Sequence, residues 1–89
     1  MSQSESDRWH FGGRWYAMTL ASDVLTRDGI GLELDDIGPA PERGQVLEAF
    51  QDDTTGEVTF TAHVAEPLPF DLVEQFVREA RRRLILPNA

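Results

Sequence analysis

The chain has 89 residues, of which 16 are acidic and 8 basic, and its formal net charge is −8. Hydrophobic residues make up 40% of the sequence and charged residues 27%, close to the average of globular domains, which argues against a disordered chain. The absence of cysteine excludes disulfides and thiolate metal sites. No apolar stretch has the roughly 18 to 20 residues of a membrane span and nothing resembles a signal peptide, so we expect a cytoplasmic protein.

The N-terminal part of the chain is polar and without pattern over residues 1–8, and we expect it to be a disordered lead-in to a single domain over residues 9–89. Trp9 and Phe11 follow, directly before a pair of glycines that forms a flexible joint. The two aromatic side chains either fold back onto an edge of the core or anchor a partner, and the sequence leaves both open.

Four segments have the alternation of apolar and polar residues that predicts β-strands. The clearest covers residues 57–64, where Val58, Phe60, Ala62 and Val64 form one row and the polar residues the other. Further strands are predicted over residues 14–21, 30–37 and 45–52. In residues 30–37 the core row begins Ile30, Leu32, Leu34. The outer row contains Gly31 and is preceded by Gly29, and such glycines often mark a close approach of another group.

The strand over residues 45–52 is ambiguous because both of its rows contain apolar residues. The turn over residues 53–56 begins with Asp and ends with Gly, which is typical of a three-residue hairpin loop. That loop sets Phe50 opposite Phe60, with Glu48 in the same core row. The opposite orientation stays open, and its core row would be Leu47 and Ala49.

The C-terminal part predicts one helix. Pro69 suits the first helical position, and apolar residues then recur at steps of three and four, giving one apolar stripe: Val73, Phe76, Val77, Ala80 and Leu84. We therefore expect an α+β fold, a four-stranded antiparallel β-meander with one C-terminal helix packed on one face.

Glu48 stands in the core row of this arrangement. Burying a carboxylate without a partner is costly, so we expect its side chain to pair with a cation. The end of the helix is rich in arginine and crosses the same face. We expect a structural ion pair between Glu48 and Arg78, Arg81 or Arg82. The functional alternative is an acid in a small pocket.

One helix covers one face of a sheet, so the other face should lie open and serve for binding. We predict that a partner contacts residues of this face and two acidic pairs at strand ends: Trp15, Ala17, Gly31, Glu33, Ala49, Thr61 and His63, with Asp35, Asp36, Asp52 and Asp53.

No motif indicates an enzyme, a metal site or a cofactor. His10 and His63 have no paired-histidine spacing, the serines have no nucleophile elbow, and the glycines are too sparse for a phosphate loop. We predict a non-enzymatic protein without metal or cofactor, and a small enzyme ranks third among the alternatives.

Size, acidity and layered architecture resemble those of the small immunity or inhibitor proteins that bacteria pair with toxins or nucleases, a likeness of class alone. It implies a domain that binds a basic protein surface, since an acidic body repels nucleic acid and anionic membranes. The alternative function is a homodimeric module whose open sheet faces pair with each other.

Overall fold

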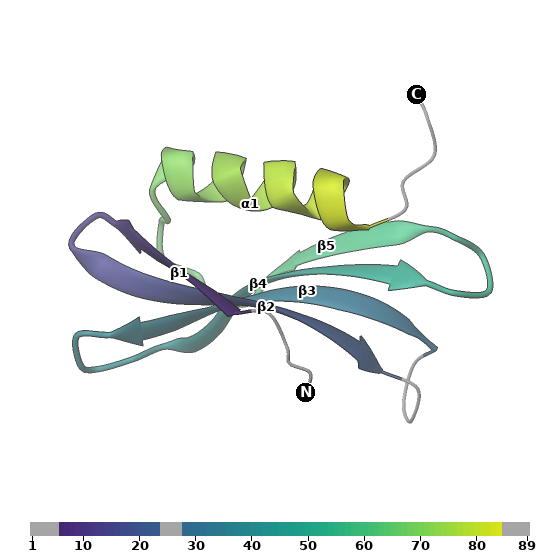
Figure 1. The fold of residues 1–89 in the computed structure, drawn as a ribbon. Coiled ribbons are helices and arrows are strands. Elements are labelled where there is room, and N and C mark those ends of the chain that lie inside the picture. The colour runs from purple at the N-terminus through teal and green to yellow at the C-terminus, as the bar shows by residue number, and fades with distance from the viewer. Residues whose placement is uncertain (1–5, 24–27, 85–89) are drawn as a thin grey trace.

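The computed structural model describes residues 6–23 and 28–84, which form one antiparallel sheet and one helix (Figure 1). The elements are β1 (Ser6–Phe11), β2 (Arg14–Asp23), β3 (Gly29–Gly38), β4 (Gly44–Asp52), β5 (Val58–Ala62) and α1 (Phe70–Arg83). The strand order in the sheet is the order in the chain, so each strand pairs with the next. The predicted α+β meander with a C-terminal helix is confirmed, except that the sheet has five strands instead of four.

The additional strand is β1, in which Trp9 pairs with Tyr16 across the first hairpin. Gly12 and Gly13 both have positive φ, the conformation that a tight two-residue hairpin turn requires. The glycine joint is therefore a turn, and Trp9 is buried in the core while Phe11 packs against it. Because β1 begins at Ser6, residues 6–8 of the expected lead-in belong to the sheet, and residues 1–5 lie outside the described residues.

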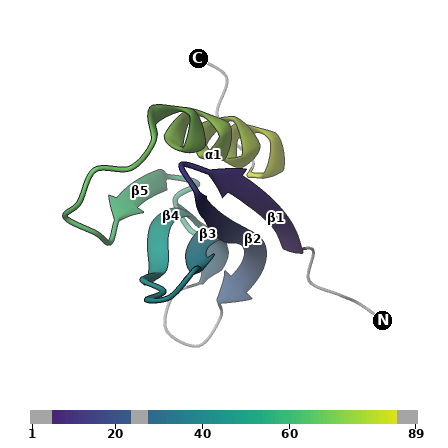
Figure 2. The same cartoon turned by 90° about the vertical axis from the view of Figure 1, so that its left-hand side faces the viewer.

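The molecule has two layers, with α1 lying across one face of a strongly twisted sheet (Figure 2). The core between the layers is formed by one row of the sheet and one stripe of the helix: Trp9, Tyr16, Met18, Leu32, Leu34, Leu47 and Ala49, with Leu72, Phe76, Ala80 and Leu84. The helix begins directly after Pro69, with Asp71 in its first turn and three arginines in its last, which complements the helix dipole. Within residues 6–23 and 28–84, no helix is long and apolar enough to cross a membrane.

The orientation predicted for the strand over residues 45–52, with Glu48 and Phe50 in the core row, is wrong for β4. Ala49 pairs with Phe60 and is 3% exposed beneath the helix, whereas Glu48 pairs with Thr61 on the opposite face. The hairpin loop has four residues, since the amide of Asp52 donates to the carbonyl oxygen of Glu57 at 2.9 Å. One residue more in the loop shifts the register by one, and a shift of one exchanges the two faces of a strand.

A bulge at Val46 adds a second irregularity to β4. Leu34 pairs with Leu47 but Asp35 pairs with Gln45, which leaves Val46 as an extra residue between them. Both Val46 and Leu47 are buried as a result. The bulge explains why strict alternation cannot describe this strand.

Candidate protein-interaction face

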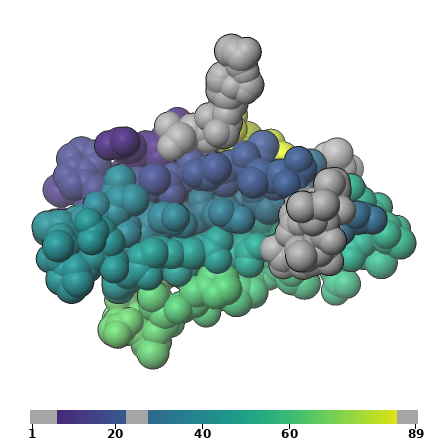
Figure 3. All heavy atoms as spheres, turned by 90° about the horizontal axis from the view of Figure 1, so that it is seen from below, coloured from purple at the N-terminus to yellow at the C-terminus, as the bar shows by residue number. Residues whose placement is uncertain are grey.

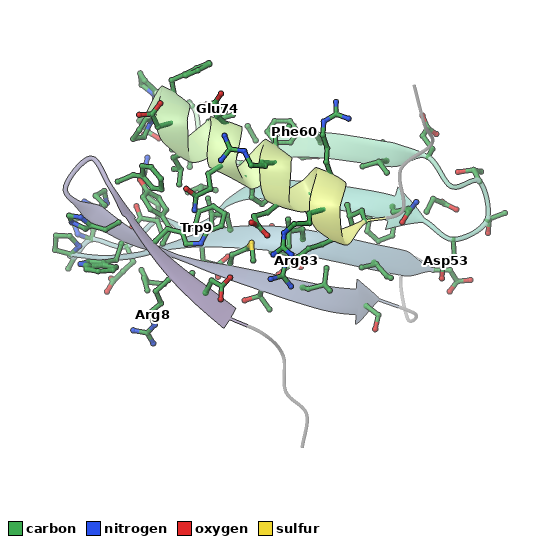
Figure 4. All side chains as sticks on the ribbon, turned by 45° about the horizontal axis from the view of Figure 1, so that its top comes forward. Arg8, Trp9, Asp53, Phe60, Glu74 and Arg83 are labelled. Carbon is green, nitrogen blue, oxygen red and sulfur yellow. The ribbon has the colours of Figure 1, made fainter. Side chains whose placement is uncertain are left out.

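The sheet face away from α1 is called the open face. It carries one row from each strand: Arg8, His10, Trp15, Ala17, Thr19, Gly31, Glu33, Asp35, Glu48, Phe50, Asp52, Thr59 and Thr61. Figure 3 views this side of the molecule, where β2 to β5 lie next to one another and the helix lies behind them, with only its yellow C-terminal end in view. Figure 4 shows the alternation at β1, where Trp9 points toward the helix and Arg8 away from it.

An exposed aromatic pair marks one end of the open face. Trp15 is 48% exposed, and its ring lies 4.6 Å from that of His10 between centroids, at an interplanar angle of 42°. The two residues face each other across β1 and β2, which fixes the position of the pair. A large exposed aromatic ring is a typical anchor for a partner.

The middle of the open face is filled by Phe50. A Cβ atom at Gly29 would lie 2.5 Å from Phe50 Cζ and 2.1 Å from the carbonyl oxygen of Gln51, so no side chain fits there. At Gly31 the same atom would lie 3.7 Å from the Phe50 ring, an ordinary contact. Gly29 thus makes room for Phe50, which is buried although no helix covers it.

Carboxylates gather beside this ring. Glu33 of β3 lies directly opposite Glu48 of β4, and Asp35 and Asp52 extend the acidic row toward the strand ends. Like charges in facing positions repel each other, so the row concentrates negative potential on one face. Glu48 is buried and its Oε1 lies 3.4 Å from His63 Nε2, which places the imidazole at the edge of the acidic row.

Several predicted binding residues do lie on this face, namely Trp15, Ala17, Gly31, Glu33, Asp35 and Thr61, and exposed His63 adjoins it. Ala49 does not, because it is buried under the helix. Asp52 is used by the hairpin loop, where its Oδ1 accepts the amides of Thr54 and Thr55 at 2.7 and 3.1 Å. Asp53 is exposed in that loop.

The expected ion pair of Glu48 with the helix is wrong, since α1 packs on the opposite side of the sheet. Arg82 Nη2 instead donates to Glu79 Oε1 at 3.0 Å, one turn away on the helix. Glu48 therefore does not stand in the core row, as the preferred orientation predicted. It is a buried member of the open face.

Asp36 is also placed differently from the prediction, because its side chain is fully buried in the core row and not exposed at a strand end. Its Oδ2 accepts bonds from Arg14 Nε at 2.9 Å and Arg43 Nε at 2.6 Å, and its Oδ1 accepts the amide of Gly38 at 3.0 Å. Burial alone would raise the pKa of Asp36, but the bonds from Arg43 and Arg14 outweigh it and hold the pKa below its ordinary value.

This cluster also fixes the connection between β3 and β4. Arg14 Nη2 donates to the carbonyl oxygens of Pro39 and Pro41, the latter at 2.9 Å, and Arg43 Nη2 donates to the Tyr16 hydroxyl at 3.2 Å. Sequence reasoning missed these partners, although the alternation of β3 was a signal for the burial of Asp36, which continues the row of Leu32 and Leu34. Because each charge is paired, we interpret the cluster as structural.

No protein-family model, curated protein or solved structure matches this chain. Among the described residues, no group of three or more histidine, aspartate or glutamate side chains is arranged to hold a metal ion.

Proposed function

We propose that this protein is a non-enzymatic, cytoplasmic binding domain that engages a basic protein surface through its open face. The observation that carries the proposal is the acidic row Glu33, Asp35, Glu48 and Asp52, which lies on the same face as the exposed ring of Trp15 at one end. Arginine and lysine side chains of a partner would pair with such carboxylates, and a guanidinium group would also stack on an indole ring. Electrostatic complementarity of this kind gives fast association and selects the partner.

The architecture supports a rigid binding surface. The acidic residues stand on β3 and β4, central strands whose positions are fixed by neighbours on both sides. A surface on central strands loses little conformational entropy when a partner binds, which favours affinity. An inhibitor or immunity protein that covers a basic site would use such a surface, and we propose this role for the domain.

Pairing of two open faces with each other fits the structure less well. Leu47 and Ala49, which would have supplied apolar contact, lie beneath the helix. A two-fold axis through the middle of the face would also bring Glu33 and Glu48 of one copy close to those of the other, and like charges in an interface are costly. A basic partner is therefore the better fit for this face.

Titration with an oligoarginine peptide tests the proposal, because two matched double variants remove the same charge from different places. Glu33→Gln/Asp35→Asn neutralises the open face, and Glu42→Gln/Glu74→Gln neutralises exposed residues elsewhere. We expect the first variant to weaken binding by about tenfold, equal to about 1.4 kcal/mol, and the second by less than about twofold. Calorimetry at low and physiological salt provides the measurement.

Amide chemical shifts mapped during the same titration locate the contact. Signals of Thr19, Glu33 and Thr61 should move, while those of the outer helix surface should not. Equal weakening in both variants, with shifts spread over all exposed acids, would show general attraction by net charge and contradict a dedicated face.

A further inference from the structure

The two edges of the sheet differ in how they are protected. The β1 edge carries charged or titratable side chains at Asp7, Arg8 and His10, and such residues discourage pairing with another strand. The β5 edge, Val58–Ala62, contains no charged residue and no proline. β5 is therefore the edge that is open to a further strand.

The backbone groups of β5 that face outward can be assigned from its bonds to β4. The carbonyl of Glu57 accepts the amide of Asp52, and the amide of His63 donates to the carbonyl of Val46. In an antiparallel pair the bonding residues alternate, so residues 57, 59, 61 and 63 face β4. The amides and carbonyls of Val58, Phe60 and Ala62 consequently point away from the sheet.

An apolar groove adjoins this edge. It has a volume of about 350 Å³, lies between β5 and α1, and is lined by Ala49, Val58, Phe60, Phe76, Val77, Ala80 and Arg81. Phe60 is 51% exposed and Val77 39%, and the Phe60 ring centroid lies 6.2 Å from that of Phe76. Figure 4 shows Phe60 beside the helix. An exposed apolar side chain next to free backbone groups provides both parts of a strand-pairing surface.

The sequence around this edge is complementary to itself when it is read against a second, antiparallel copy. With Phe60 opposite Phe60 of the second copy, Val58 faces Ala62 and Thr59 faces Thr61. Glu57 then faces His63, an acid against a base, at both ends of the contact. Aromatic pairs, threonine pairs and pairs of opposite charge are the combinations that stabilise neighbouring strands.

We propose that the protein forms a two-fold symmetric dimer by antiparallel pairing of β5 with β5 of a second copy, centred on Phe60. This register pairs the outward groups found above, Phe60 with Phe60 and Val58 with Ala62, each pair forming two backbone hydrogen bonds. A shift by two residues keeps hydrogen bonds but loses the contact between Glu57 and His63. The symmetric register is thus selected by side chains, and the contact is isologous.

The dimer uses a different surface from the proposed function and does not depend on it. Both sheets would continue into one, with the two open faces on the same side. The edge of one short strand is a small interface, so we expect a concentration-dependent equilibrium between monomer and dimer.

Sedimentation equilibrium from about 5 µM to about 1 mM protein tests the dimer. Ala62→Pro removes an outward amide, and proline is tolerated where an edge amide faces solvent, so the fold should persist. We expect the dissociation constant of the dimer to rise at least about tenfold in this variant. Binding of the oligoarginine peptide should remain as in the parent, which separates failure of the dimer from failure of the open face.

Two double variants at exposed positions test the register without proline. Thr59→Glu/Thr61→Arg places opposite charges across the axis and should tighten the dimer about fivefold, whereas Thr59→Glu/Thr61→Glu places like charges there and should abolish it. Circular dichroism checks that each variant is folded. A parent that stays monomeric at about 1 mM, or a dimer that is indifferent to both double variants, would overturn the proposal.

Discussion

At the scale of single residues, Asp36 shows how a buried charge is retained in a small core. Its carboxylate has three donors, Arg14, Arg43 and the amide of Gly38, so the charge is paired from three segments of the chain. Removing one partner of such a group is costly because the remaining charges stay partly buried and unpaired. The side chains of Arg14 and Arg43 are about a quarter exposed, so water screens their charges and lowers the free-energy cost of removing Asp36.

We expect Asp36→Asn to lower the free energy of unfolding at pH 7 by about 3 kcal/mol. The pKa of Asp36 is lowered in the folded state, so its contribution is present above the unfolded pKa near 3.8 and is lost as pH falls through the folded pKa. The variant should therefore lose less stability than the parent on acidification through this range. Urea unfolding at pH 7 and at a pH below the folded pKa of Asp36 measures the free energy of unfolding of variant and parent, with Asp53→Asn as an exposed control. Parallel pH profiles for variant and parent would contradict the assignment.

The sequence reveals only part of this cluster. Alternation along β3 separates Asp36 from Asp35 and indicates that Asp36 joins the core row. Its arginine partners come from β2 and from the end of the connection before β4. Their approach depends on the pairing of three strands and on the bulge beside Tyr16. The local pattern contains no information about such registers. The predicted acidic surface pair Asp35 and Asp36 therefore consists of one residue on the open face, Asp35, and one buried residue, Asp36, which forms ion pairs.

At the scale of elements, β4 decides which residues form the candidate site. Elements with one apolar row were predicted well: β2, β3, β5 and α1 occur close to their expected ranges. β4 has apolar residues in both rows, and its orientation depended on a loop that is one residue longer than expected. The rings of Phe60 and Phe76 lie 6.2 Å apart between centroids, but β5 is an edge strand, which leaves Phe60 half exposed.

The orientation of β4 can be tested with two alanines on opposite faces. Ala49→Arg would bury a charge beneath the helix, at a cost of at least about 4 kcal/mol, enough to unfold most of a domain with marginal stability. Ala17→Arg lies on the open face opposite Asp35 and should change stability by less than about 1 kcal/mol. Thermal denaturation followed by circular dichroism compares them. A folded Ala49→Arg protein beside an unfolded Ala17→Arg protein would reverse the assignment of faces.

At the scale of the whole molecule, the net charge of −8 acts against compaction, because the folded state brings carboxylates closer together than the unfolded chain does. The facing residues Glu33 and Glu48 show this locally. Screening by salt weakens repulsion between exposed groups over about 10 Å at 0.1 M, whereas the buried pairs of Asp36 are screened much less.

We therefore expect the melting temperature to rise with sodium chloride between about 0.01 and 0.5 M, by about 4 to 8 °C if screening contributes about 1 kcal/mol. The rise should be smaller in Glu33→Gln, which removes one charge from the facing pair Glu33 and Glu48. Scanning calorimetry provides both values. A melting temperature that falls with salt would mean that attractive ion pairs outweigh the repulsion.

The succession of elements has a consequence for the protein as it is synthesised. Every strand pairs with its neighbour in the chain, so the sheet can form hairpin by hairpin as residues leave the ribosome. Its inner row, with Met18, Leu34 and Leu47, is covered by α1, the last of the described elements. Until that helix has emerged, the nascent sheet presents an uncovered apolar face, and this is the stage at which the chain most needs protection from aggregation.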